Sequence, residues 1–314
     1  MIYTGNCLDI LPTLPAQSVH CCVTSPPYWG LRDYGHADQL GNERTPGEYV
    51  QRMVQVFREV WRVLRDDGTL WLNLGDSYGA AGGDIFSGFN ERYSGTGAGG
   101  KQAAIGKNAA AAGGRERSTG LRPKNLVGIP WRVAFALQDD GWYLRQDIIW
   151  HKPNPMPESV QDRCTKAHEY VFLLTKQPRY YYDMTAIQEA AVCGSNGSSF
   201  VSEYDIQTKP NLGKGKREDS NVRNKRSVWT VATAPYQGAH FATMPPKLVE
   251  PCILAGCPVG GVVLDPFAGS GTTGAVATSL GRNFVGIELN PAYVELAEER
   301  IGNSQPALQF EAQP

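Results

Sequence analysis

The chain has 314 residues, of which 41% are hydrophobic and 19% are charged, and its formal net charge is -1. This much apolar material can bury a core, which excludes wholesale disorder, and no run of about 18 apolar residues offers a membrane span. The N-terminus also lacks the basic and apolar regions of a signal peptide. Because the overall charge is close to zero, any binding of nucleic acid must depend on a local basic patch.

The seven cysteines favour a reduced, cytoplasmic protein without a metal site. No Cys-x-x-Cys pair occurs among them, so their spacing fits neither a zinc site nor a disulfide framework. Several fall within apolar runs, and we therefore expect buried thiols. The seven are Cys7, Cys21, Cys22, Cys164, Cys193, Cys252 and Cys257.

The first part of the chain predicts a strand, a helix and a second strand. Residues 19–23 form a short apolar run that stops at a Ser-Pro-Pro sequence, which is typical of a buried strand. Residues 46–64 carry apolar side chains at helical spacing and begin with a proline suited to a first turn. An Asp-Gly pair stops this helix, and residues 69–74 predict the next strand.

Residues 78–124 interrupt this pattern. Glycine and alanine dominate there and no hydrophobic period survives, which predicts a long flexible loop or insert. The segment is either a solvated linker or a loop that becomes ordered on a polyanion. Its basic residues are Arg92, Lys101, Lys107, Arg115 and Arg117.

Regular structure returns with a helix predicted at 130–138 and strands at 143–150 and 169–175. Residues 183–228 are again polar and irregular, and they contain the most basic window of the chain. Such a window is either a solvated face or a contact with nucleic acid. Its basic residues are Lys209, Lys214, Lys216, Arg217, Arg223, Lys225 and Arg226.

The C-terminal part predicts alternating helices and strands joined by a glycine-rich turn. This order is that of one half of a Rossmann-like sheet. The strands are expected at 261–264 and 283–287, and the helices at 246–255, 275–280 and 291–301.

The glycine-rich turn has the spacing of a cofactor-binding turn. Gly269, Gly271 and Gly274 fit G-x-G-x-x-G, and Glu288 follows about 20 residues later, where an acid can bind ribose hydroxyls. Taken alone, the pattern fits NAD, FAD or S-adenosylmethionine. Asp265 begins the turn, and a carboxylate there suits a cationic amine and would repel a pyrophosphate.

A second motif, Ser25-Pro26-Pro27-Tyr28-Trp29, follows the first predicted strand. The two prolines fix φ and stiffen the turn. The turn presents the Ser25 hydroxyl, the Pro26 carbonyl and the Tyr28 ring at the carboxyl end of a strand, where open α/β sheets bind ligands. Two acceptors beside an aromatic ring suit a planar base with an amino group. Taken alone, the motif also fits a turn packed on a core.

Together the two motifs resemble those of the amino-methylating DNA methyltransferases. These enzymes carry a (Ser/Asn/Asp)-Pro-Pro-Tyr motif and an Asp-Pro-Phe-x-Gly-x-Gly motif, which correspond to residues 25–28 and 265–271. The catalytic motif comes first here, as in the circularly permuted β group of that family. Residues 5–9, 162–170 and 240–245 resemble further family segments.

The resemblance implies a Rossmann-like α/β fold, with a mostly parallel sheet, helices on both faces and a target-recognition insert. Residues 1–182 would form the catalytic half, 183–228 the target-recognition region and 229–314 the half that binds S-adenosylmethionine. Both halves would belong to one methyltransferase domain.

Site residues are carried over by position. Ser25, Pro26, Pro27 and Tyr28 would act on the target base, with Trp29 a second stacking ring. The target-recognition region would supply the basic DNA contacts named above. The residues implied for the cofactor are Asn6, Cys7, Asp265, Phe267, Gly269, Ser270, Gly271, Thr272 and Glu288.

The implied reaction moves a methyl group from S-adenosylmethionine to the exocyclic amine of a flipped base. Hydrogen bonds from the amine to Ser25 and to the Pro26 carbonyl would free the nitrogen lone pair, and positioning would supply most of the catalysis. Flipping costs a few kcal/mol, which stacking on Tyr28 would partly offset. Serine at the first position of the motif resembles the cytosine-N4 enzymes, and adenine N6 is the alternative.

Other functions share single features of the sequence. An NAD-dependent oxidoreductase shares the glycine turn, but it leaves the Ser-Pro-Pro-Tyr motif unexplained. A cytosine-C5 enzyme needs a nucleophilic cysteine, and Cys252 follows a proline but lies in a predicted helix. A protein-glutamine methyltransferase has its motifs in the other order, and a non-catalytic DNA-binding relative would have no need for both motifs.

The resemblance also implies partners and a location. The expected partner is double-stranded DNA, with a companion restriction endonuclease and a second copy of the chain as further partners. No membrane and no metal are expected. The expected source is a bacterium or a phage, and the expected location is the cytoplasm.

Overall fold

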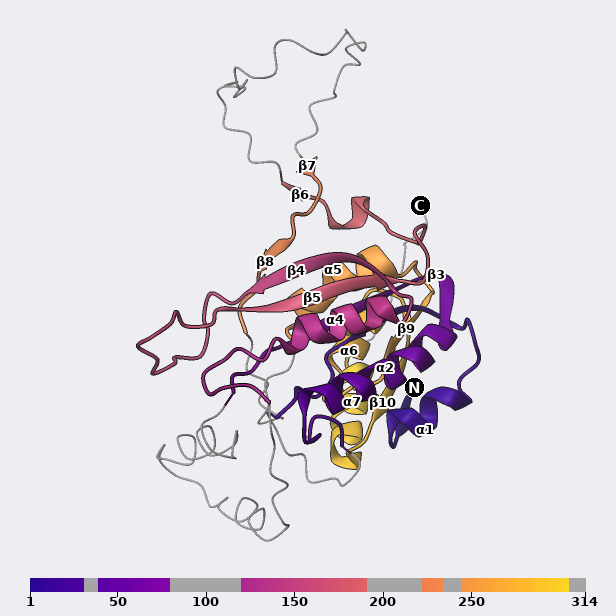
Figure 1. The fold of residues 1–314 in the computed structure, drawn as a ribbon. Helices are drawn as coiled ribbons and strands as arrows, with labels where there is room; N and C mark the ends of the chain where they lie inside the picture. The colour runs from indigo at the N-terminus through magenta and orange to yellow at the C-terminus, as the bar shows by residue number, and fades with distance from the viewer. Residues whose placement is uncertain (31–38, 80–119, 191–221, 234–243, 305–314) are drawn as a thin grey trace, which may run out of the picture.

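The computed structural model describes residues 1–30, 39–79, 120–190, 222–233 and 244–304. In this part of the chain eight strands form one sheet in the order β1-β10-β9-β2-β3-β5-β4-β8, and β6 and β7 form a separate two-stranded antiparallel sheet (Figure 1). The strands are β1 (Ile2–Thr4), β2 (Val19–Thr24), β3 (Leu64–Leu74), β4 (Tyr143–His151), β5 (His168–Thr175), β6 (Glu189–Ala190), β7 (Val222–Arg223), β8 (Val228–Thr230), β9 (Val262–Asp265) and β10 (Asn283–Glu288).

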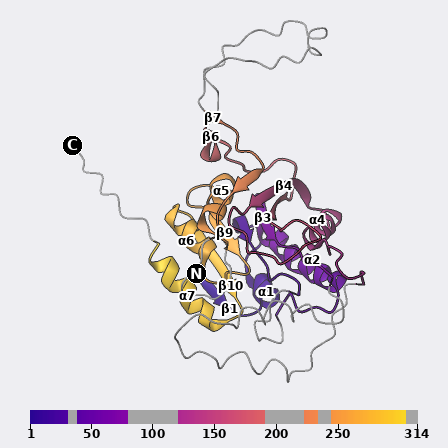
Figure 2. The ribbon, with the colours of Figure 1, turned by 90° about the vertical axis from the view of Figure 1, so that its left-hand side faces the viewer.

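Helices lie on both faces of the sheet, as the two views in Figures 1 and 2 show. The α-helices are α1 (Cys7–Ile10), α2 (Pro46–Val63), α4 (Ile129–Asp139), α5 (Pro246–Gly256), α6 (Thr272–Ser279) and α7 (Pro291–Gly302). Two short 3-10 helices, η1 (Leu11–Thr13) and η2 (Thr185–Ile187), complete the described helices.

The sheet is mostly parallel, as predicted. All strand pairs of the large sheet are parallel except those that β5 makes with β3 and β4. The carboxyl ends of the other seven strands therefore lie at one edge, and the amino end of β5 lies at the same edge. Both motifs lie at this edge, because each follows the carboxyl end of a parallel strand.

Strands β2 and β9 come from distant parts of the sequence and are neighbours in the sheet. These neighbours pair in parallel through Cys21 with Val263 and Cys22 with Leu264. From this junction the sheet continues to β3 on one side and to β10 on the other. The junction is thus a switch point, the place where open α/β sheets leave a crevice for ligands.

Alternating side chains along the strands build a separate core on each face. Leu70, Leu72 and Leu74 of β3 join the cluster under α2 and α4, whereas Trp71 joins the cluster under α5 and α6. This period of two is what a strand buried on both faces requires. The predicted doubly covered sheet is confirmed.

Three features differ from the predicted elements. The predicted helix at 46–64 ends at Val63, and β3 begins at Leu64 instead of residue 69. Strand β1 and helix α1 were not predicted. Strand β8 crosses the predicted boundary at residue 228 and joins the large sheet beside β4. Most of the predicted loop at 78–124 lies outside the described residues.

Candidate active site

The Ser-Pro-Pro-Tyr motif lies where β2 ends, next to the junction of β2 with β9. The Tyr49 hydroxyl of α2 donates a hydrogen bond of 2.9 Å to the Pro27 carbonyl and fixes the turn. Within the described residues no donor reaches the Pro26 carbonyl. Ser25 is partly exposed, and its hydroxyl contacts the Tyr28 hydroxyl at 3.4 Å. The turn therefore offers two acceptors for an amino group.

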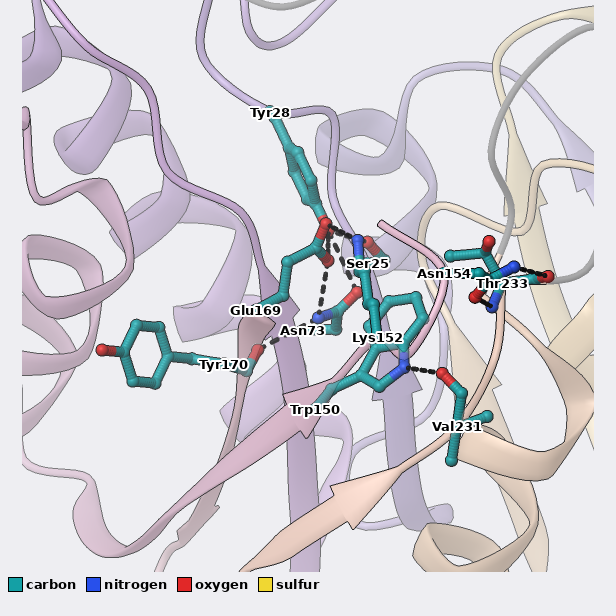
Figure 3. A network of polar contacts seen from close by, with 10 residues as sticks. All are labelled: Ser25, Tyr28, Asn73, Trp150, Lys152, Asn154, Glu169, Tyr170, Val231 and Thr233. Carbon is teal, nitrogen blue, oxygen red and sulfur yellow. Dashed lines mark hydrogen bonds and ion pairs between the residues drawn. The ribbon is translucent and has the colours of Figure 1, made fainter. Parts of the chain in front are cut away.

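The Tyr28 hydroxyl belongs to a network that joins four strand ends (Figure 3). It lies 2.7 Å from Glu169 Oε2 and 3.0 Å from Asn73 Oδ1. The Asn73 amide donates to the Tyr170 carbonyl at 3.0 Å and to Glu169 Oε2 at 3.3 Å. Lys152, directly after β4, pairs with Glu169 Oε1. The catalytic motif is thus anchored to β3, β4 and β5.

Burial and charge keep the Tyr28 hydroxyl protonated. Burial and the negative charge of Glu169 raise the pKa of Tyr28 well above its ordinary value. Tyr28 is therefore a hydrogen-bond donor and not a base. A Cβ atom added to Gly75 would lie 2.4 Å from Cε2 of the Tyr28 ring. The ring can occupy this position because residue 75 has no side chain.

The three glycines of the second motif have different roles. Gly269 has φ +52°, and an added Cβ would meet nothing closer than 4.0 Å, so the backbone there borders open space. At Gly271 an added Cβ would lie 2.8 Å from Cβ of Ala297, and at Gly274 it would lie 2.4 Å from Cδ1 of Ile301. Of the three, Gly269 leaves room for a ligand, whereas the other two allow α7 to pack closely.

Glu288 ends β10 and holds the glycine turn. Its Oε2 accepts from the Gly269 N–H at 2.8 Å, and its Oε1 accepts from the Asn290 N–H at 2.8 Å. The side chain is partly exposed beside the open space at Gly269. A carboxylate is the type of acceptor that binds the hydroxyls of a ribose. The turn and Glu288 therefore fit the expected cofactor.

Asp265 is buried at the place where the two motifs meet. The side chain is 2% exposed and accepts hydrogen bonds from Thr24 at 2.6 Å, Thr273 at 2.8 Å and the Phe267 N–H at 3.0 Å. Burial raises its pKa to about 6, although these hydrogen bonds act to lower it. Asp265 therefore ties the two motifs together, and its expected place beside a cofactor amine stays a prediction.

Other predicted cofactor residues also have partners within the protein. Ser270 and Thr272 are 4% and 5% exposed, and the Arg300 guanidinium donates to their hydroxyls at 3.2 and 2.8 Å. The Asn6 side chain caps α1 by accepting from the Leu8 N–H at 3.0 Å. Cys7 is buried beside it, which raises its pKa to about 12. Phe267 is only partly buried at the turn.

The predicted DNA contacts have mixed outcomes. The structure does not support the prediction that Trp29 is a second stacking ring. Its side chain is 1% exposed, and its indole N–H donates to the Glu43 carbonyl at 2.9 Å. Arg223 and Arg226 both pair with Glu189. Lys225 lies over the Trp229 ring at 5.2 Å. Four predicted contacts, Lys209, Lys214, Lys216 and Arg217, lie outside the described residues.

The cysteines of the described chain are free thiols. Cys252 lies buried in α5, where its thiol donates to the Leu248 carbonyl at 3.4 Å. Burial raises its pKa, so it is not the nucleophile that a cytosine-C5 enzyme would need. Cys164 is exposed, unlike the buried thiols expected. In the ranges described, no group of His, Cys, Asp or Glu could hold a metal ion, and no helix is long and apolar enough to cross a membrane.

Sequence reasoning missed three members of the Tyr28 network. Asn73 is a buried polar residue at the end of an apolar strand, a signal that the sequence did contain. Glu169 stood in a segment that resembled the family, but no role was assigned to it. Lys152 gave no signal, because its proximity to Glu169 depends on the pairing of β4 with β5.

Comparisons with known proteins agree with this geometry. Residues 19–299 match the model of a family described as DNA methylase, which covers N6 and N4 enzymes. The type II methyltransferase M.Cfr9I of Citrobacter freundii is 47% identical over 302 residues, which are 96% of this chain and 87% of that protein. M.SmaI of Serratia marcescens is 46% identical over 300 residues, 96% of this chain and 90% of that protein.

Two solved structures share the fold. The PvuII DNA methyltransferase, described as cytosine-N4-specific, has a TM-score of 0.61 at 20% identity over 95% of this chain and 85% of its own. TTHA0409 of Thermus thermophilus, described as a putative DNA modification methylase, has a TM-score of 0.56 at 24% identity over 98% and 96% of the two chains.

Proposed function

The chain belongs to the DNA methylase family and is a site-specific methyltransferase of amino groups in DNA, and on that premise we propose that its target is cytosine N4. The observation that carries the binding of an exocyclic amine is the pair of acceptors at the end of β2, and the choice of cytosine is argued below. In the described chain these are the Ser25 hydroxyl and the Pro26 carbonyl, which no described donor occupies.

The two acceptors suit an exocyclic amine with two N–H bonds. One N–H would donate to Ser25 and the other to Pro26. This pairing draws the nitrogen away from conjugation with the ring and directs its lone pair toward the methyl donor. Tyr28, held at its hydroxyl by Glu169, offers the ring on which a flipped base stacks, worth roughly 1–3 kcal/mol.

The methyl donor is S-adenosylmethionine, with which the structural relative TTHA0409 is complexed. It supplies an electrophilic methyl group when bound. Gly269 and Glu288 would hold it, because Gly269 borders open space and Glu288 presents a carboxylate beside it. Phe267 would contact it at the turn. Asp265 stabilises that turn through Thr24 and Thr273.

Two observations favour cytosine over adenine. Serine stands first in the catalytic motif, where adenine-N6 enzymes usually carry Asp or Asn. The PvuII enzyme, with the same fold, is described as cytosine-N4-specific. Adenine N6 remains the second candidate, because a serine hydroxyl accepts an N–H from either base.

The proposed setting is restriction and modification. The similar proteins M.Cfr9I and M.SmaI are type II methyltransferases by name. We therefore propose double-stranded DNA as the substrate, a companion restriction endonuclease with the same recognition sequence, and a cytoplasmic location. A dimer of the chain is part of the same proposal.

The test of the site is the pair of variants Ser25→Ala and Tyr28→Ala. Each is expected to reduce methyl transfer to DNA at least 100-fold, while calorimetry shows S-adenosylmethionine bound as in the unaltered protein. The matched controls are Ser18→Ala and Tyr143→Ala, which alter a partly exposed and an exposed residue outside the site and should methylate normally. Turnover close to that of the unaltered protein in both site variants would refute the proposed site.

A further inference from the structure

A row of donors leads from the catalytic turn to a carboxylate. The Ser25 hydroxyl donates to the Tyr28 hydroxyl at 3.4 Å, and the Tyr28 hydroxyl donates to Glu169 Oε2 at 2.7 Å. The first contact is long for an O–H···O bond, and such contacts in free enzymes shorten when substrate binds. All three side chains point toward one another in Figure 3.

The row has a direction. Each hydroxyl has a single proton to give, and Ser25 gives its proton toward Tyr28 while Tyr28 gives its own toward Glu169. The lone pairs of Ser25 are thereby left for the target amine. Asn73 Oδ1, at 3.0 Å from Tyr28, is a second acceptor for the phenolic proton, but an amide oxygen is a far weaker base than a carboxylate.

Glu169 is placed to end such a row. Its side chain is 15% exposed, and its other oxygen pairs with Lys152, whose side chain is 18% exposed. Lys152 lies in turn over the Trp150 ring at 4.2 Å, and Trp150 donates to the Val231 carbonyl at 2.8 Å. The carboxylate is therefore fixed on the side away from Tyr28. Binding of the target amine by Ser25 and the Pro26 carbonyl requires nothing of Glu169 beyond its hydrogen bond with Tyr28.

We propose that Glu169 takes up the proton that the target amine releases as it is methylated, with Ser25 and Tyr28 passing it along. The inference rests on the proposed function, because it needs Ser25 to hold the amine. It adds an acceptor that neither motif contains.

The step balances in atoms and charge. The lone pair of the amine nitrogen forms a bond to the methyl carbon, the bond from that carbon to the sulfonium sulfur of the donor breaks, and its electron pair stays on sulfur as a neutral thioether. The nitrogen then has a fourth bond and a positive charge. One N–H bond breaks, its electron pair stays on nitrogen, and the proton bonds to Ser25 Oγ. Ser25 passes its own proton to Tyr28, and Tyr28 passes the phenolic proton to Glu169 Oε2. The products are a neutral methylated amine and a neutral Glu169 carboxyl group, with both hydroxyls restored.

The high pKa of Tyr28 agrees with this order of events. A phenol that resists ionisation passes a proton only as it receives one, so the three transfers are coupled to the arrival of the methyl group. Loss of the acceptor is therefore expected to slow methyl transfer itself. Removing a general base typically costs about 10²- to 10⁴-fold in rate.

The experiment is single-turnover methylation of a DNA duplex by Glu169→Gln, followed over a range of pH. Glutamine keeps the size and the hydrogen bond from Tyr28 but removes the base. The rate at neutral pH is expected to fall about 100-fold or more. For the unaltered protein we expect a fall in rate at acid pH, because the acceptor must be unprotonated, and this fall should be absent from Glu169→Gln. Glu169→Asp, which restores a carboxylate, should recover part of the rate.

Other titratable groups face Glu169 and define the controls. They are Tyr28 from the catalytic turn, Lys152 beyond β4, and Lys166 and His168 at the start of β5. Since all of them remain in Glu169→Gln, any change in the acid limb of the profile belongs to Glu169. The matched control Asp140→Asn removes an acid that pairs with Arg58 on the helix layer, and it should leave the profile unchanged.

A second variant tests whether the residues act as a row. Tyr28→Phe keeps the ring and removes the hydroxyl, and the double variant with Glu169→Gln should be no slower than the slower single variant. Unfolding by urea and cofactor binding by calorimetry should match the unaltered protein for each variant. Independent, multiplying losses would contradict the row.

The outcomes separate the two proposals. If Ser25→Ala and Tyr28→Ala lose activity but Glu169→Gln keeps a rate within about threefold, or keeps the acid limb at a lower rate, the proton acceptor is refuted and the proposed function stands. If Ser25→Ala and Tyr28→Ala both stay fully active, the proposed site is refuted, and the proton route is refuted with it.

Discussion

Tyr28 is held from several sides at once. Its hydroxyl meets Glu169 and Asn73, and one edge of its ring rests on the bare backbone of Gly75. The position of the proposed catalytic side chain thus depends on Gly75, which has no side chain. Such a dependence of function on packing can be tested without touching any polar group.

Gly75→Ala is expected to displace the Tyr28 ring, because the new Cβ would lie 2.4 Å from Cε2 and 2.8 Å from Cδ2 of that ring. We expect a loss of methyl transfer of about 10-fold or more, since small misplacements of reacting groups have large effects on rate. Cofactor binding should be unchanged.

The matched control is Gly302→Ala at the end of α7, where an added Cβ meets nothing within 4 Å. Steady-state methylation of a DNA duplex by both variants gives the comparison. Equal activity in Gly75→Ala and Gly302→Ala would show that the ring position does not matter for the reaction.

Gly271 is expected to matter for stability instead. Gly271 and Gly260 have the same φ of +75°, but an added Cβ at Gly271 would lie 2.9 Å from Cα of Ala297, whereas at Gly260 it would meet nothing within 4 Å. Gly260→Ala should therefore cost only the backbone strain, about 1–2 kcal/mol. Gly271→Ala should cost more, because overpacking adds about 1–3 kcal/mol.

Urea unfolding of both variants measures the difference. A free energy of unfolding that is equal in Gly271→Ala and Gly260→Ala would contradict the close packing of the glycine turn on α7.

Among the elements, β9, β2 and α6 are joined by one buried carboxylate. Asp265 at the end of β9 accepts from Thr24 at the end of β2 and from Thr273 in α6. Burial raises its pKa from the ordinary 3.8 to about 6. The folded protein therefore binds this proton more tightly than the unfolded chain does.

The sign of the pH dependence follows directly. Because the folded pKa is raised, the contribution of Asp265 to stability is greatest below about pH 4 and declines as the pH rises through about 6. Between about pH 4.5 and pH 7 the decline is about 2 kcal/mol.

Asp265→Asn should remove this decline, because asparagine does not titrate. Urea unfolding at both pH values, in the unaltered protein and the variant, isolates the effect of this carboxyl group. Only the change with pH is compared, since the amide also alters the hydrogen bonds to the two threonines. Parallel pH profiles for the two proteins would contradict the raised pKa.

Most elements could be predicted from the sequence because their burial follows a simple period. Helix α2 is an example, with Met53, Phe57 and Val60 buried on one stripe. The start of β3 could not be predicted, since residues 65–67 are polar and exposed and carry no apolar signal. That stretch is a strand because Leu64 pairs with Val19 of β2. Such a tertiary contact overrides local preference.

At the scale of the whole molecule, the sequence predicted the two motifs but not how the site is completed. The motifs meet because β2 and β9 are neighbours at the switch point. Glu169 reaches Tyr28, and Lys152 reaches Glu169, because β5 runs antiparallel between β3 and β4, and no sequence period specifies that arrangement. The burial of Trp29 likewise depends on the fold and not on the local sequence, which is why a stacking role was expected for it.

The central claim is that this site methylates cytosine N4 in DNA. The most direct measurement is mass spectrometry of nucleosides from unmodified DNA that has been incubated with the protein and S-adenosylmethionine. We predict N4-methylcytosine, absent when Ser25→Ala replaces the unaltered protein. N6-methyladenine in its place, or no methylated base on either single- or double-stranded DNA, would contradict the claim.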